Sequence, residues 1–365
     1  MQIIAYDPAW RDATLAFRRR MYPCNPQAGD EQHFVWRQER HPFGAGLSLL
    51  AVQDGQVIGH WLGIPERIRC PGAVRTCQWM VDLAVAPEHR DTMAAMQLFR
   101  AAGARGENLL AIGVPEDLLP FYTVFRWQRL AIADTFFRVF QPGPSATMAE
   151  RSLPMAPLVR LADRLLPLAW RARSALRRAT SVRLESQPGQ EFDRLFDELA
   201  PSLGRCGDRG SAWLRWKLFD RPCGAHELLV ARDPAGRLQG WIALKRRERA
   251  GKARWAEIVD FLCHPDRPDL FDELVEAASS RALQAGCAFV RLRCALPEHC
   301  ARLRRPSWVR QVRSPIDDLF LLPGADPGAR GDLLGHPWHL SSGASDSVDT
   351  GQDEWLDASP TGPLR

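Results

Sequence analysis

The stretch VDLAVAPEHRD, from Val81 to Asp91, returns later in the chain as VDFLCHPDRPD, from Val259 to Asp269. The two copies share valine, aspartate, proline and a second aspartate at a constant offset of 178 positions. A long-range repeat of this kind predicts a duplicated structural unit and has to be recognised before any fold is assigned.

Other matches run in the same order at nearly the same offset. LLAVQDGQVIGHW at 49–61 resembles LLVARDPAGRLQGW at 228–241, and Trp36 corresponds to Trp216 at an offset of 180. We therefore predict two copies of one domain, each of about 150 residues, an ordinary size for a domain. The predicted parts are a first domain, a linker, a second domain and a tail: 1–145, 146–181, 182–335 and 336–365.

Composition agrees with a two-domain globular protein. The chain has 365 residues, of which 45% are hydrophobic and 25% charged, enough for two cores of normal size. It has neither a membrane-spanning apolar run nor the pattern of a signal peptide, and its nine cysteines show no CxxC spacing. A cytoplasmic protein with reduced thiols is the simplest expectation.

The first half alternates between the periods of strands and helices. Its predicted order is strand, helix, hairpin, long strand, helix, strand, helix and closing strand: 2–6, 10–21, 49–53 with 57–64, 78–85, 94–102, 108–114, 118–125 and 133–140. The hairpin is centred on Asp54-Gly55, a dipeptide typical of tight β-turns. The fold class is therefore α/β, with a mixed sheet flanked by helices in each half.

This order, together with two motifs, resembles the GNAT superfamily of acyl-CoA-dependent N-acyltransferases. The family's cofactor signature, V-x-P-x-x-R-G-x-G-x-G/A after a strand, fits the frame of 85–95, but Asp91 and Met93 occupy two of its glycine positions. Its second signature, N-x-x-A-x-x-F-Y-x-x-x-G-F, fits 115–127 and includes Phe121 and Tyr122. The whole arrangement is similar to bacterial tandem GNAT proteins often associated with polysaccharide gene clusters.

The resemblance implies an N-acyltransferase that uses acetyl-CoA or another acyl-CoA. A helix N-terminus offers free N–H groups and a positive dipole end to the pyrophosphate. The expected cofactor-binding residues are those of the strand end, the loop, the next helix start and one aromatic: Leu83, Ala84, Val85, Arg90, Asp91, Thr92, Met93, Ala94, Ala95 and Phe121.

The same resemblance implies catalytic roles. Tyr122 is expected to protonate the leaving thiolate, and Asp82 or Glu116 is expected to take the proton of the amine. Asp82 has a structural alternative, because its counterpart Asp260 lies in a half that keeps little of the cofactor motif. Trp36 and His60 are expected to line the acceptor cleft.

The second half is expected to be a catalytically silent copy that shapes the acceptor site. The resemblance implies transfer of an acetyl group to a primary amine on a small molecule, with an amino sugar of surface polysaccharide as the leading acceptor. Two alternatives stay open: a non-catalytic tandem scaffold and an aminoacyl-tRNA-dependent transferase of the FemAB type. No metal site is predicted, since no HExxH or paired CxxC motif occurs.

The linker region concentrates the surplus positive charge. Residues 151–183 hold eight arginines and one acid, while leucines recur every three or four positions. Three interpretations stay open for residues 155–180: an interfacial helix on the inner face of an anionic membrane, a nucleic-acid contact, or a helix whose leucines pack between the domains.

Overall fold

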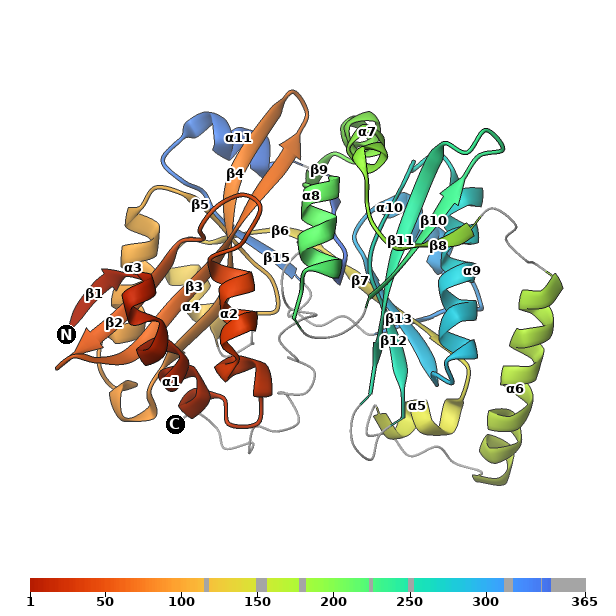
Figure 1. The fold of residues 1–365 in the computed structure, drawn as a ribbon, viewed down its shortest axis with the longest axis horizontal. Coiled ribbons are helices and arrows are strands. Elements are labelled where there is room, and N and C mark those ends of the chain that lie inside the picture. Colours follow the sequence, from red (N-terminus) through yellow and green to blue (C-terminus); the bar gives the residue numbers. More distant parts are fainter. Residues whose placement is uncertain are drawn as a thin grey trace.

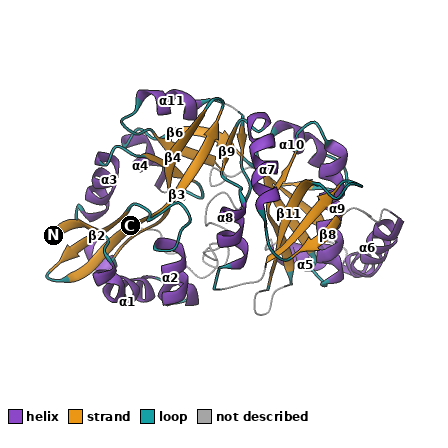
Figure 2. Cartoon of the chain, turned by 45° about the horizontal axis from the view of Figure 1, so that its top comes forward, coloured by secondary structure: helices purple, strands orange, loops and turns teal. Residues whose placement is uncertain are grey.

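The computed structural model describes residues 1–114, 118–148, 156–176, 182–222, 226–248, 253–311, 318–335 and 337–342. Two mixed β-sheets lie side by side, and helices cover their outer faces (Figures 1 and 2). The α/β class and the two-copy organisation predicted above are therefore confirmed.

The first sheet has the spatial order β1-β2-β3-β4-β5-β15-β6. Its strands are β1 (Gln2–Ala5), β2 (Ser48–Gln53), β3 (Gln56–Cys70), β4 (Ala73–Val85), β5 (Asn108–Ala111), β15 (Asp318–Leu322) and β6 (Gln128–Ile132). Two short strands extend it beside β3: β9 (Arg205–Gly207) and β16 (Trp338–His339). In the β2–β3 hairpin Asp54 and Gly55 have φ of 50° and 74°, as a two-residue turn with both positions left-handed requires.

The second sheet repeats this order as β8-β10-β11-β12-β13-β7-β14. Its strands are β8 (Val182–Glu185), β10 (His226–Arg232), β11 (Leu238–Arg247), β12 (Trp255–Cys263), β13 (Phe289–Cys294), β7 (Asp134–Val139) and β14 (Val309–Arg310). In both sheets the fourth and fifth strands of this order form a parallel pair, β4 with β5 and β12 with β13.

The two halves exchange one strand. β7 comes from the first half but pairs with β13 and β14, while β15 comes from the second half but pairs with β5 and β6. Reciprocal ion pairs secure the exchange: Asp134 bonds Arg310 at 2.7 Å, and Asp318 bonds Arg129 at 2.5 Å. Each sheet is thus completed by the other half, so the halves are interlocked.

The helices fill the connections between strands. They are α1 (Arg11–Met21), α2 (Glu31–Gln38), α3 (Ala94–Ala104), α4 (Leu119–Val124), α5 (Pro142–Met148), α6 (Ala156–Leu176), α7 (Gln190–Leu199), α8 (Ser211–Leu214), α9 (Pro268–Gln284), α10 (Pro297–Leu303) and α11 (Pro327–Leu334). The short helical turns are η1 (Pro8–Trp10), η2 (Pro26–Gly29), η3 (Pro87–His89), η5 (Ala200–Ser202) and η6 (Arg215–Phe219). The predicted helices at 10–21, 94–102 and 118–125 correspond to α1, α3 and α4.

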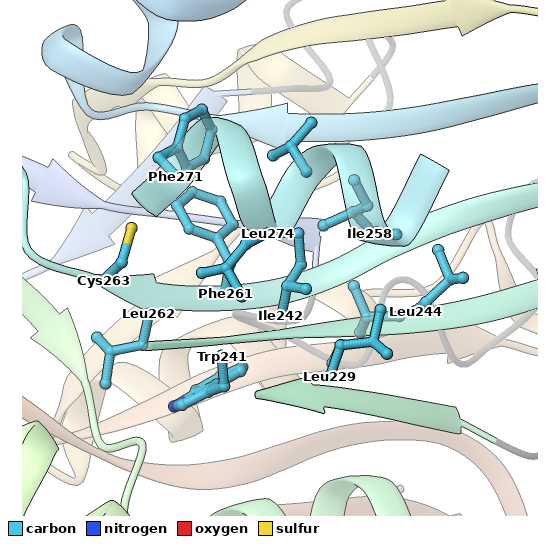
Figure 3. Close-up of a cluster of buried hydrophobic side chains, with 14 of the residues drawn as sticks. Leu229, Trp241, Ile242, Leu244, Ile258, Phe261, Leu262, Cys263, Phe271 and Leu274 are labelled. Carbon is cyan, nitrogen blue, oxygen red and sulfur yellow. The ribbon is translucent and has the colours of Figure 1, made fainter. Parts of the chain in front are cut away.

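The larger core lies in the second half, where one face of β10–β12 packs on α9 (Figure 3). Ile242, Ile258, Phe261 and Leu274 are fully buried there. The tail begins inside the fold, because Trp338 is only 2% exposed and lies in β16. Most of the predicted tail, from 343 onward, lies outside the described residues.

Candidate active site

The candidate site of the first half lies where β4 leaves β5. The two strands pair only from Cys77 to Trp79, so on this side Met80 to Val85 has no strand partner among the described residues. A bulge marks the departure, because Val81 is the extra residue between Met80 and Asp82, which pair with consecutive residues of β3. The open edge contains Leu83, Ala84 and Val85, three of the residues expected to bind the cofactor.

The second half has the same bulge. Val259 is the extra residue of β12 between Ile258 and Asp260, which pair with consecutive residues of β11. Val259 and Val81 are 178 positions apart, the offset found in the sequence. The repeated phrase therefore encodes a repeated irregularity of the backbone as well as a repeated strand.

Tyr122 lies at the departure point. Its hydroxyl is 3.8 Å from the Sδ of Met80, and its ring packs against Trp127 and Phe320 with centroid distances of 4.7 and 5.3 Å. Burial raises the pKa of Tyr122 well above its usual value, so the phenol stays protonated, as a proton donor must. Phe320 belongs to the exchanged strand β15, so the second half helps to hold this side chain.

The predicted cofactor loop is an exposed turn that leads into α3. Arg90, Asp91, Thr92 and Met93 are all exposed, whereas Ala94 at the helix start is fully buried. The Thr92 hydroxyl accepts a hydrogen bond of 3.2 Å from the Ala94 N–H. First-turn amides of a helix have no carbonyl partner inside the helix, so α3 presents donors beside this loop.

The remaining residues predicted to bind the cofactor lie next to the loop. Ala95 is half-buried in the first turn of α3, and Phe121 on α4 is half-buried with its ring 6.2 Å from that of Phe99. Through Phe99 and Met80, helix α4 thus contacts both α3 and β4. Asp91 places a negative charge in this loop, where it would repel a phosphate.

We expect Asp91→Asn to strengthen acetyl-CoA binding about two- to fivefold, because it removes the repulsion between an exposed carboxylate and the pyrophosphate, worth about 0.3–1 kcal/mol in water. Calorimetric titration measures the change. The matched control is Asp269→Asn, the equivalent residue at the start of α9, which should leave the affinity unchanged. An equal gain in both variants would show a general charge effect and contradict a phosphate site at 90–95.

Asp82 is the centre of a buried ionic network. One carboxylate oxygen forms an ion pair with Arg18 of α1, and the other accepts from the Tyr22 hydroxyl at 2.5 Å and lies 3.2 Å from Nε2 of His60. Burial alone would raise the pKa of Asp82, but His60 and Arg18 hold it well below its usual value. A carboxylate this strongly stabilised is a weak base, which favours the structural alternative.

His60 is completely buried on β3, with its ring 5.2 Å from that of Phe17. Burial lowers the pKa of His60, although the nearby carboxylate of Asp82 opposes this shift. The other predicted base, Glu116, lies outside the described residues. Among the described residues no three His, Cys, Asp or Glu side chains are grouped as metal ligands.

Trp36 and Trp216 form a symmetric pair where the halves meet. Their rings stack at a centroid distance of 4.6 Å and an angle of 15°. Each indole N–H donates to the backbone carbonyl of the other residue, at 2.9 and 3.0 Å.

Both side chains also line a hollow of about 870 Å³ between α2 and the segment 216–222. Trp36, predicted in the acceptor cleft, thus borders a hollow but is mainly an anchor between the halves.

Buried basic residues of both halves gather close to this pair. Burial, together with Arg37 and Arg221, lowers the pKa of His33 to about 2. Burial, together with Arg221 and Arg247, lowers the pKa of Lys245 to about 6. At pH 7 His33 and most of Lys245 are therefore neutral, and the positive charge near the pair is that of the arginines Arg37, Arg221 and Arg247.

The second half has no tyrosine that corresponds to Tyr122, the expected proton donor of the first half. The position that corresponds to Tyr122 holds Leu303 or Arg304, at offsets of 181 and 182, and Leu303 is buried on α10. Asp260, the counterpart of Asp82, bonds Arg209 at 3.0 Å and accepts from the Ser341 hydroxyl at 2.7 Å. The repeated aspartate therefore has buried charge partners in both halves.

Sequence reasoning missed Arg18 and Tyr22, the partners of Asp82. Arg18 lies in the last turn of α1, and Tyr22 is the residue that ends the helix, its N–H donating to the Arg18 carbonyl. Two signals could have pointed to this pair: the spacing of four positions, and the fact that Tyr22 is one of only three tyrosines in the chain.

No protein-family model matches the sequence, and no curated protein matches it. Solved structures do resemble it. A probable N-acyltransferase from Enterococcus faecalis has a TM-score of 0.57 at 12% identity, with 88% of this chain and 72% of that one covered. A GCN5-related N-acetyltransferase from Anabaena variabilis has a TM-score of 0.56 at 12% identity, with the same coverages.

N-myristoyltransferase from Saccharomyces cerevisiae, solved with myristoyl-CoA and inhibitors, has a TM-score of 0.59 at 11% identity, with 88% of this chain and 79% of that one covered. At such identities the similarity shows the fold. Since the sheet order is repeated within the chain, this fold is the tandem GNAT fold.

Proposed function

We propose that the chain is an acyl-CoA-dependent N-acyltransferase whose first half carries the chemistry. The observation that supports this most is the meeting of three features: the open edge of β4, the start of α3 and the buried hydroxyl of Tyr122. The named N-acyltransferases among the similar structures use the same fold. The second half, with Leu303 or Arg304 in place of the acid, would shape the acceptor side.

An acyl-CoA supplies an activated thioester to a primary amine. The backbone of Leu83 to Val85 would orient and polarise its carbonyl, and the first turn of α3 would hold its pyrophosphate. The amine nitrogen attacks the carbonyl carbon, the carbon–sulfur bond breaks, and Tyr122 donates its proton to the departing sulfur. Glu116 is proposed as the base that takes the amine proton, since Asp82 is held by three partners.

We propose an acetyl group as the acyl group and an amino sugar of surface polysaccharide as the acceptor. The resemblance to tandem GNAT proteins supports this choice. The basic residues at the join would also attract an acceptor that carries a carboxylate or phosphate. Asp91 and Met93 in the cofactor loop favour a second candidate, a non-catalytic scaffold, because both crowd a phosphate site that glycines normally open.

Tyr122→Phe is expected to lower kcat about a hundredfold while leaving the dissociation constant of acetyl-CoA within about threefold, because only the proton donor is lost. Calorimetry gives the affinity, and release of free coenzyme A with a panel of amino sugars gives the rate. Tyr6→Phe, a tyrosine whose hydroxyl donates to Glu39 at 2.8 Å, is the matched control and should keep its rate.

Two results would distinguish the acyl-CoA-dependent enzyme from the non-catalytic scaffold. Absence of detectable heat at high micromolar acetyl-CoA would reject the acyl-CoA enzyme. Binding without turnover, in both the native chain and Tyr122→Phe, would support the scaffold.

A further inference from the structure

One face of helix α6 packs on the protein, and the opposite face is exposed to solvent. Its inward side contains Val159, Asp163 and Trp170, which are half-buried. Asp163 accepts from the Gly143 N–H at 2.9 Å, and the Trp170 ring lies 5.9 Å from that of Phe140. At 100° per residue these three inward positions fall within a sector of about 40°.

The opposite side of α6 is an exposed leucine stripe. Leu158, Leu161, Leu165 and Leu168 are 54%, 51%, 53% and 57% exposed. They fall within a sector of about 80° that points away from the inward side. Figure 1 shows α6 at the outer edge of the molecule, beyond α9. Of the three interpretations left open for this segment, packing of these leucines between the domains is therefore contradicted.

Arginines border the leucine stripe on one side. Arg160, Arg164 and Arg171 are exposed and fall within a sector of about 40° next to the leucines. Asp163 is the only acid in Ala156–Leu176, and it lies on the inward side. The exposed surface of α6 thus combines an apolar stripe with a row of positive charges.

We propose that α6 binds the surface of an anionic lipid bilayer. A helix of this kind lies in the plane of the interface, with leucines among the acyl chains and arginines at the headgroups. No helix in the described part of the chain has the length and apolarity to cross a bilayer, so the contact would be peripheral.

The charge pattern favours this partner over two others. Pairing of two α6 helices would cover the leucines but bring six arginines together without an acid on the exposed side. Nucleic acid would attract the arginines but leave the leucine stripe in water. An anionic bilayer is complementary to both features, and this inference does not depend on acyltransferase activity.

Flotation with vesicles tests the proposal on the full chain. We expect binding to vesicles of phosphatidylcholine with about one-third phosphatidylglycerol, at least tenfold weaker binding to phosphatidylcholine alone, and loss of binding in high salt. Absence of flotation with the anionic vesicles at low salt would overturn the proposal.

Two double variants separate the contributions. Leu161→Gln with Leu165→Gln, and Arg164→Gln with Arg171→Gln, should each weaken vesicle binding at least tenfold, because each removes one of the two attractive features. All four side chains are exposed, so the circular dichroism spectrum should not change. The matched controls are Leu184→Gln on β8, where the leucine is 57% exposed, and Arg237→Gln, where the arginine side chain is 80% exposed.

A second copy of the chain or a nucleic acid, as the partner of α6, would give different results. A dimer in solution that the leucine variant dissociates would show that a second copy covers the stripe, and would overturn the lipid assignment. Vesicle binding that survives both double variants would overturn it too. Binding of RNA that depends on the arginines alone, without vesicle binding, would identify nucleic acid instead.

Discussion

Replacing Asp82 with asparagine is expected to lower the free energy of unfolding by about 3–5 kcal/mol, because it breaks a buried ion pair and leaves one charge without its partner. The stranded charge would be that of Arg18, whose side chain is only 4% exposed. Tyr22 and His60 would lose the same carboxylate. Urea denaturation followed by tryptophan fluorescence measures the loss.

The double variant Arg18→Met with Asp82→Asn is the control. Removing both charges should recover part of the lost stability, since a buried pair can be replaced by apolar groups at little cost. The opposite pattern would assign a different role to Asp82. If Asp82→Asn unfolds at the same urea concentration as the native chain but loses activity a hundredfold, then Asp82 is the base.

Replacing Trp36 with alanine is expected to cost about 3–5 kcal/mol, the usual range for deleting a buried tryptophan. Trp36 is 3% exposed, and its loss removes both the stack on Trp216 and the hydrogen bond to the Trp216 carbonyl. Since the pair joins the two halves, thermal unfolding should also become broader, as the halves lose part of their coupling.

A cycle of variants checks this interpretation. Trp36→Phe keeps an aromatic ring but removes the indole donor, so its cost should be smaller by at least about 1 kcal/mol. Trp36→Ala and Trp216→Ala combined should cost less than the sum of the single variants, because both remove the same contact. Full additivity would mean that the two side chains contribute independently, and the pair would then not couple the halves.

Local features of the fold were predictable from the sequence. The Asp54-Gly55 turn forms where predicted, because two left-handed positions favour this dipeptide whatever its surroundings. The helix at 94–104 forms because its apolar positions share one face. The repeated VD phrase correctly indicated two copies of one sheet, since both copies meet the same need for an inward valine, a bulge and a buried aspartate.

The sheet to which the strand β7 belongs was not predictable. Residues 133–140 were expected to close the first half, and a strand does form at Asp134–Val139, but it pairs in the second sheet. Alternation of apolar and polar residues identifies a strand without identifying its neighbour. The choice depends on long-range contacts such as Asp134 with Arg310, which no local pattern contains.

The candidate site also combines features that the local sequence predicts with contacts that depend on the tertiary fold. The duplicated α/β fold, the loop before α3 and the motif that contains Tyr122 could be inferred from the sequence, because they follow from local periodicity and from a motif with fixed spacing. Three contacts could be found only in the folded molecule: Tyr122 with Phe320 of the other half, Asp82 with Arg18, and Trp36 with Trp216. These contacts join residues 64 to 198 positions apart, and their energies arise only when burial removes water from both partners.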